Sequence, residues 1–153
     1  MRHGTRLGID VGRVRVGVAG CDPDGLLATP VATLARDAHL LDALAPLLGQ
    51  YDPIELVVGL PLSLSGADTP STADARAVAA ELDARFEVPV RLVDERMSTN
   101  LAQQALRASG RSSRRSRFVV DQVAAVIILQ SALDAERGTG RPAGVLVTPE
   151  GTL

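Results

Sequence analysis

The sequence predicts an α/β domain built on a five-stranded mixed sheet, with three antiparallel strands followed by two parallel strands and helices on both faces. Residues 6–34 alternate apolar with small or polar side chains, a period of two that is typical of strands. Two short apolar runs at 56–59 and 90–93 then alternate with segments of helical spacing. An antiparallel meander followed by strand–helix–strand crossovers gives a mixed sheet covered on both sides.

Residues 6–20 are predicted to form the first hairpin. The glycine that opens positions 12–13 suits a two-residue turn. In that register Asp10 pairs with Arg15 and the apolar side chains of both strands share one face. Asp10 then lies on the opposite face among glycines, where a ligand could approach.

A third strand is expected over 26–34, at an edge of the sheet because it contains Pro30. Leucines at helical spacing predict a helix over 40–48, which Pro46 should kink or shorten. The continuous apolar run at 56–59 is typical of a parallel strand buried on both faces.

The second half of the chain is expected to be mostly helical. Apolar spacing predicts a helix over 75–86, then the strand at 90–93. Ser98 is the predicted N-cap of a helix over 98–108, and a basic loop is expected over 111–117. A long apolar helix follows over 118–133 and ends near residue 138.

At 153 residues the chain is expected to hold one domain, residues 1–137, followed by a Gly/Pro-rich tail at 138–153 that could add a short strand at 145–147. The N-terminus resembles no signal peptide, and no apolar run approaches the ~20 residues that span a bilayer. Cys21 is the only cysteine, which excludes an intrachain disulfide and favours the cytoplasm; an intermolecular disulfide stays open.

The net charge of −2 excludes a polycation that coats nucleic acid, so any such contact must come from a local patch. All 16 basic residues are arginines, whose planar fork grips phosphate. No acidic residue interrupts 97–120, although a run of this kind is often only a solvated loop. The candidate nucleic-acid-binding residues are Arg13, Arg15, Arg96, Arg111, Arg114, Arg115 and Arg117. Aromatic side chains are scarce, which favours recognition of shape and backbone over stacking on bases.

Three carboxylates occupy places where an acid is costly unless it is used. Asp10 lies near the end of the first strand, Glu95 follows the strand at 90–93, and Asp121 lies near the start of the last helix. Ligands of open α/β sheets bind at the carboxyl ends of the strands, so the three acids could converge there. Oxygen ligands of this kind suit Mg²⁺ or Mn²⁺, and two such ions can activate water and stabilise a leaving oxygen.

Each acid also has a structural interpretation. Asp10 could form a salt bridge with Arg15 across the hairpin. Glu95 could pair with the next arginine or cap a helix, and Asp94 competes with it as the ligand. Asp121 could simply interact with the macrodipole in a first helical turn.

Five segments form a recurring set in a fixed order: Gly8-Ile9-Asp10-Val11-Gly12, Arg15-Val16-Gly17-Val18-Ala19, Val57-Val58-Gly59-Leu60-Pro61-Leu62, Asp94-Glu95-Arg96-Met97-Ser98-Thr99 and Asp121-Gln122-Val123-Ala124-Ala125. In order and spacing they resemble the YqgF-type (RuvX) family of pre-16S rRNA nucleases, which are also described as Holliday-junction-resolvase-like. The resemblance covers roughly residues 6–135, and the order and spacing of its motifs make it specific. The chain departs from the family at Val14, where a basic residue is common, and at 63–66, where Ser-Leu-Ser-Gly replaces a more polar loop.

The resemblance implies an RNase H-like fold and metal-dependent cleavage of structured nucleic acid, precursor rRNA or branched DNA, leaving 5′-phosphate and 3′-hydroxyl ends. It assigns catalysis and metal binding to Asp10, Glu95 and Asp121. A non-catalytic nucleic-acid-binding or ribosome-maturation factor is the first alternative. A phosphotransferase is the second, since the Asp-x-Gly hairpin also resembles a phosphate loop of actin-like ATPases. We expect a monomer or homodimer.

Overall fold

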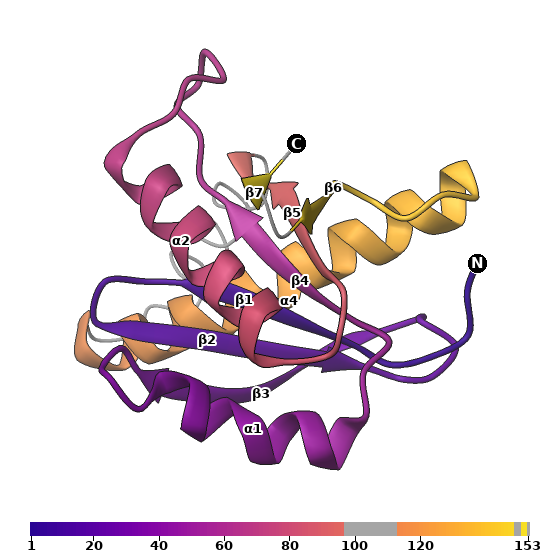
Figure 1. The fold of residues 1–153 in the computed structure, drawn as a ribbon, viewed down its shortest axis with the longest axis horizontal. Coiled ribbons are helices and arrows are strands. Elements are labelled where there is room, and N and C mark those ends of the chain that lie inside the picture. Colours follow the sequence, from indigo (N-terminus) through magenta and orange to yellow (C-terminus); the bar gives the residue numbers. More distant parts are fainter. Residues whose placement is uncertain (97–112, 149–150, 153) are drawn as a thin grey trace.

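The structure is a computed structural model that describes residues 1–96, 113–148 and 151–152, with only the backbone described over 113–121 and 151–152. Within these residues seven strands form one sheet in the order β3-β2-β1-β4-β5-β6-β7 (Figure 1). They are β1 (Arg6–Val11), β2 (Arg15–Cys21), β3 (Ala28–Ala35), β4 (Glu55–Leu60), β5 (Val90–Asp94), β6 (Val145–Thr148) and β7 (Gly151–Thr152).

The predicted mixed sheet is confirmed, and the predicted number of five strands is wrong. The antiparallel meander β1–β3 joins β4 through a parallel β1–β4 pair, and β5 continues in parallel. The additional strands come from the C-terminal segment, where β6 pairs antiparallel with β5 and β7 with β6. These strands are too short and too close to glycines for a sequence pattern to define both of them.

The register of the first hairpin differs from the prediction. Asp10 lies opposite Gly17, not Arg15, because three residues, 12–14, connect the strands. The Gly12 N–H donates to the carbonyl of Arg15 at 3.0 Å and closes the turn. The register has moved by two residues, which leaves every side chain on its predicted face, so the alternation of the sequence could not distinguish the two registers.

The described helices are α1 (Leu40–Tyr51), α2 (Pro70–Arg85) and α4 (Ser113–Thr139). Helix α1 continues past Pro46 for a further turn, so the expected shortening does not occur. The N-terminus of α2 is fixed by a capping box, in which Thr69 and Thr72 exchange hydrogen bonds. The helix predicted over 98–108 lies outside the described residues.

Helix α4 begins five residues earlier than predicted. Residues 113–117, expected to belong to a basic loop, form its first turn and a half. Asp121 is therefore the ninth residue of a 27-residue helix, beyond the first turn where the macrodipole acts. This position removes the macrodipole as the reason for an acid at 121.

The helices cover the two faces of the sheet separately, as Figure 1 shows, with α1 and α2 on one side and α4 on the other. On the first face, α1 and α2 enclose the apolar side chains that alternate along β1, β2 and β4. On the second face, Ala125, Ile128 and Leu129 of α4 pack over the small side chains of the sheet. A Cβ at Gly8 would lie 2.7 Å from that of Leu129, so only glycine in β1 lets α4 approach so closely.

A buried ionic cluster ties the far end of α4 to the start of the sheet. Glu136, 3% exposed, forms ion pairs with Arg2 at 2.6 Å and with the fully buried Arg6 at 3.0 Å. Arg2 also contacts Glu55 of β4 at 2.8 Å, and Arg91 of β5 contacts the same carboxylate at 2.9 Å. Buried charges are stable only in such closed sets.

Two further observations concern the lone cysteine, for which an intermolecular disulfide stayed open, and the hydrophobicity of the helices. Cys21 is buried, with the Arg6 N–H donating to its sulfur at 3.3 Å, and burial raises the pKa of its thiol. Within the residues that the structure describes, none of the helices has the length and hydrophobicity that crossing a bilayer requires.

Candidate active site

Asp10 lies near the end of β1 on the face that α4 covers. Gly8, two residues earlier on the same face, contacts Ala125 and Leu129. Asp10 is partly buried, and its neighbour across the hairpin is Gly17. The position therefore offers a carboxylate at the end of a central strand, with a glycine rather than a bulky side chain opposite it.

Glu95 follows β5 directly and turns toward the same face. Its N–H donates to the carbonyl of Leu60 at 3.3 Å, which fixes it to the end of β4. A Cβ added at Gly59 would collide with the Glu95 carboxylate, and it would lie 2.5 Å from Ile128 of α4. The carboxylate thus lies against a glycine of β4, beneath the helix.

The electrostatics of Glu95 link it to Asp10. Burial first, and then the negative charges of Asp10 and Asp94, together raise its pKa from 4.5 to about 7. The structure therefore brings the two predicted acids Asp10 and Glu95 close enough to repel each other. An adjacent cation would relieve this repulsion.

Asp94, the competing acid, has a different partner. Its carboxylate is exposed and accepts hydrogen bonds from Arg96, including one from Nε at 2.8 Å. These bonds lower the pKa of Asp94. The ion pair with Arg96 gives Asp94 a structural role in the loop that follows β5.

The third predicted acid, Asp121, is placed through the backbone of α4, and its side chain lies outside the described part. The side-chain amide of the next residue, Gln122, donates from Nε2 to the hydroxyl of Thr33 at 3.0 Å. Thr33 lies opposite Gly17, which in turn lies opposite Asp10. Position 121 is therefore at the level of Asp10, one turn before Ala125. Among the described side chains, a set that lacks that of Asp121, no group of three potential metal ligands occurs.

The predicted arginines fall into three groups. Arg13 is exposed in the 12–14 turn, and Arg15 begins β2. Arg96 is paired with Asp94. The remaining four are not described as side chains: Arg111 lies outside the described residues, and Arg114, Arg115 and Arg117 lie in the first part of α4.

Sequence reasoning did not identify a set of contacts, here called the brace, in which Arg36 and Asp74 support the 12–14 turn. Arg36 donates to the carbonyl of Gly12 at 3.0 Å and forms an ion pair with Asp74 of α2 at 2.7 Å. Its own N–H donates to the carbonyl of Val14 at 2.9 Å. The side chains of Arg13, Arg36 and Asp74 line a hollow of ≈ 390 Å³. No linear signal connects residues that are so far apart in the chain.

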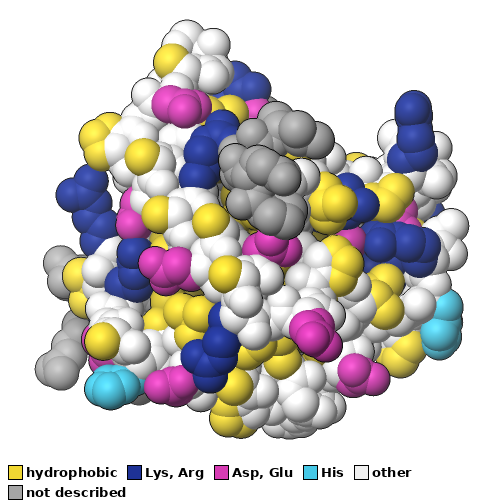
Figure 2. Space-filling view, in the orientation of Figure 1, with side chains coloured by type: hydrophobic (Ala, Val, Ile, Leu, Met, Phe, Trp, Pro, Cys, Tyr) yellow, Lys and Arg dark blue, Asp and Glu magenta, His cyan; other side chains and the backbone are white. Residues whose placement is uncertain are grey.

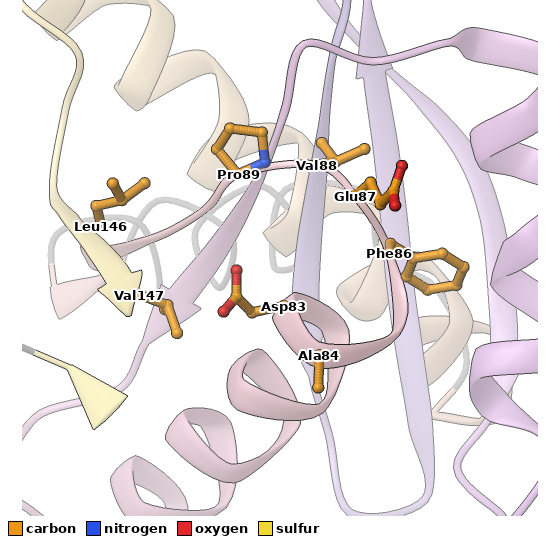
Figure 3. A pocket seen from close by; sticks show the side chains of 8 residues that line it. All are labelled: Asp83, Ala84, Phe86, Glu87, Val88, Pro89, Leu146 and Val147. Carbon is orange, nitrogen blue, oxygen red and sulfur yellow. The ribbon is translucent and has the colours of Figure 1, made fainter. Parts of the chain in front are cut away.

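A separate hollow of ≈ 400 Å³ lies where β5 begins, at the other end of the sheet (Figure 3). It is lined by the end of α2, the following turn and β6, and its charged side chains are the acids Asp83 and Glu87. A lining with acids and without arginines repels phosphate, so this hollow does not extend the candidate nucleic-acid interface.

Comparison of the folds places the chain in a class. The structure of T. thermophilus RuvC in complex with a Holliday junction substrate covers 92% of this chain and 99% of its own, with a TM-score of 0.52 at 18% identity. At that identity the likeness concerns the fold alone, which is RNase H-like, as the sequence predicted.

The family follows from the sequence comparisons. The family model described as "RuvX: Holliday junction resolvase" matches residues 4–135. A relative from Clavibacter michiganensis is 57% identical over 151 residues, 96% of this chain and 93% of its own. One from Streptomyces coelicolor is 56% identical over 147 residues, 94% and 88% of the two chains. Both are named "Putative pre-16S rRNA nuclease". The chain belongs to the RuvX family.

Proposed function

We propose that this protein is a metal-dependent endonuclease that hydrolyses phosphodiester bonds in structured nucleic acid. The preferred substrate is pre-16S rRNA, the RNA that the names of the relatives give, and we propose that cleavage occurs at its 5′ end. Branched DNA is the second candidate substrate. The observation that carries the proposal is the electrostatic coupling of Asp10 and Glu95 under helix α4. Two mutually repelling carboxylates at a strand end are stable and useful when a cation joins them.

The donors present fit Mg²⁺ or Mn²⁺. Asp10 and Glu95 supply hard carboxylate oxygens, and Gly59 leaves room for the second of them. Asp121 would complete the set from α4, where its position at the level of Asp10 supports the assignment. When bound, the ions would supply activation of water and stabilisation of the leaving oxygen.

The chain's own residues would bind and orient the substrate. Arg13 would contact a phosphate near the acids; its exposure in the 12–14 turn that follows Asp10 supports this role. Arg15 begins the strand next to Asp10, and Arg96 lies one residue beyond Glu95. We assign the same role to Arg111, Arg114, Arg115 and Arg117. Arginine forks on phosphates would fix the position of the scissile bond before cleavage.

Cleavage of defined substrates tests the proposal. A pre-16S rRNA fragment with its 5′ extension and a four-way DNA junction are incubated with wild type, Asp10→Asn and Asp42→Asn. Asp42 is a control because it lies on α1 and pairs with Arg85. We expect wild type and Asp42→Asn to cut one of the substrates only when Mg²⁺ or Mn²⁺ is added, and Asp10→Asn to be inactive.

Two results would contradict the proposal. Equal cleavage by wild type and Asp10→Asn would separate the activity from the acids. Tight binding of the rRNA fragment without cleavage, unchanged by Asp10→Asn or by a chelator, would instead favour the non-catalytic maturation factor.

A further inference from the structure

The loop between β4 and α2, residues 61–69, is a closed hairpin that projects from the end of the sheet (Figure 1). The Ser63 N–H donates to the carbonyl of Ala67 at 3.0 Å, and the Gly66 N–H donates to the carbonyl of Ser63 at 2.8 Å. Gly66 has a φ of +87°, which suits the left-handed position of a three-residue hairpin turn. The tip of the loop is therefore held in shape by its own hydrogen bonds.

Leu64 stands at the tip of this hairpin and is 90% exposed, the largest exposed fraction of any large apolar side chain in the described part of the chain. Single exposed apolar residues are ordinary on protein surfaces, so exposure alone assigns nothing. In Figure 2 the projection forms the top of the molecule, with hydrophobic surface near its end. The backbone there needs a turn-forming residue, and nothing in the fold of the hairpin requires a leucine.

The position of the tip gives the exposed leucine its significance. The hairpin leaves β4 just after Leu60, whose carbonyl accepts a hydrogen bond from the N–H of Glu95. Arg96 donates from Nη1 to the carbonyl of Leu64 itself at 3.4 Å. The apolar tip is thus tied to the residue that follows the candidate catalytic Glu95. No acid occurs at the tip, over residues 61–67. The one acid of the hairpin, Asp68, lies beyond the tip and forms an ion pair with Arg76 of α2 at 3.7 Å.

We propose that Leu64 inserts between bases of the substrate next to the scissile phosphate and makes the enzyme specific for sites where the strands are distorted. Proteins use leucine and similar apolar side chains as wedges that unstack a base step and kink a duplex. Here the hairpin supplies the rigid support, and Arg96 connects that support to the acids. The inference rests on the proposed nuclease function and names the feature of the substrate that is recognised.

A fluorescent base tests the insertion directly. The better substrate of the cleavage assay carries 2-aminopurine beside the cut position, and it is bound by Asp10→Asn protein so that it stays intact. We expect the emission to rise on binding, because the base leaves the stack, and to stay low when Leu64→Ala is added to Asp10→Asn. Leu64→Phe should preserve the rise.

Cleavage by protein with an intact acidic site gives the second measurement. Leu64→Ala should cut a paired substrate about tenfold more slowly, and a substrate with a mismatch at the same step at nearly the wild-type rate, since removing a leucine contact matters only where unstacking is needed. Leu26→Ala is the matched control, because Leu26 is 61% exposed in the turn before β3, at the other end of the sheet.

The outcomes separate this inference from the proposed function. If wild type cleaves but Leu64→Ala gives the same emission and the same rates on both substrates, the wedge is wrong and the nuclease stands. If wild type cleaves neither substrate, the proposed function fails, and the wedge that rests on it fails with it. If wild type cleaves but the emission rises equally for Asp10→Asn with and without Leu64→Ala, the wedge alone is refuted.

Discussion

Glu95 should lower the stability of the metal-free protein, and replacing it should raise that stability. Burial and the nearby charges of Asp10 and Asp94 raise its pKa from 4.5 to about 7, so the folded state disfavours the ionised carboxylate. Each pKa unit corresponds to about 1.36 kcal/mol, so the rise from 4.5 to about 7 means that ionised Glu95 costs the folded state on the order of 3 kcal/mol. Between pH 4.5 and 7 the unfolded chain loses this proton first, and the contribution to stability falls as pH rises.

The change to make is Glu95→Gln, which keeps the shape that fits against Gly59 and removes the charge. Urea unfolding in EDTA gives the free energy of unfolding of wild type and variant at several pH values. We expect equal stabilities near pH 4 and a variant that is more stable by up to about 3 kcal/mol above pH 7. Glu81→Gln, at an exposed position of α2, should change the stability by less than about 0.5 kcal/mol.

If Glu95→Gln is equally or less stable than wild type at pH 8, the ionised Glu95 carboxylate does not destabilise the folded protein and the prediction is wrong. A gain that is the same at pH 4 and pH 8 would also refute it, since the effect would not come from the charge.

Four further predictions use the same assays. Gly59→Ala should abolish cleavage and lower the free energy of unfolding by about 1–3 kcal/mol, because its methyl group collides with the Glu95 carboxylate. The control Gly49→Ala, in α1 with open space around it, should raise the free energy of unfolding by about 0.5–1 kcal/mol. Glu136→Gln should cost about 3–5 kcal/mol at pH 7 by breaking a buried ionic cluster; a variant within 1 kcal/mol of wild type would contradict this. The wild-type stability should also fall as pH drops from about 4.5 toward 2, since hydrogen bonds from arginine lower the pKa of Glu136 to about 2. Asp94→Asn should retain cleavage within a few-fold of wild type while Glu95→Gln loses it, and loss in both would make Asp94 a ligand after all.

The positions of the strands could be predicted from the sequence where burial alone determines which residues are apolar. The runs at 56–59 and 90–93 lie in β4 and β5 as expected, because strands covered on both faces must be continuously apolar. The faces of β1 and β2 were also correct. Their register was not, since a shift of two residues leaves the same alternation and only the length of the 12–14 turn decides between the two.

Other features depend on contacts that a linear pattern does not contain. The arginine-rich start of α4 has no apolar periodicity, so sequence alone placed the helix boundary at residue 118 instead of Ser113. The brace formed by Arg36 and Asp74 joins segments that only the fold brings together. For the site, the sequence placed Asp10 and Glu95 at strand ends, but the glycine at 59 that makes room for the second acid appears only once β4 and β5 are adjacent.

The ionic cluster around Glu136 also sets a length constraint on α4. The cluster fixes one end of the helix to the start of the sheet, and position 121 lies fifteen residues back along the same rigid rod. An α-helix turns by about 100° per residue, so a single inserted or deleted residue between the two points would rotate position 121 away from the sheet while leaving the cluster intact. Insertions between residues 121 and 136 should therefore reduce activity far more than substitutions on the outer surface of this part of α4. The number of residues between these two positions is expected to tolerate no change.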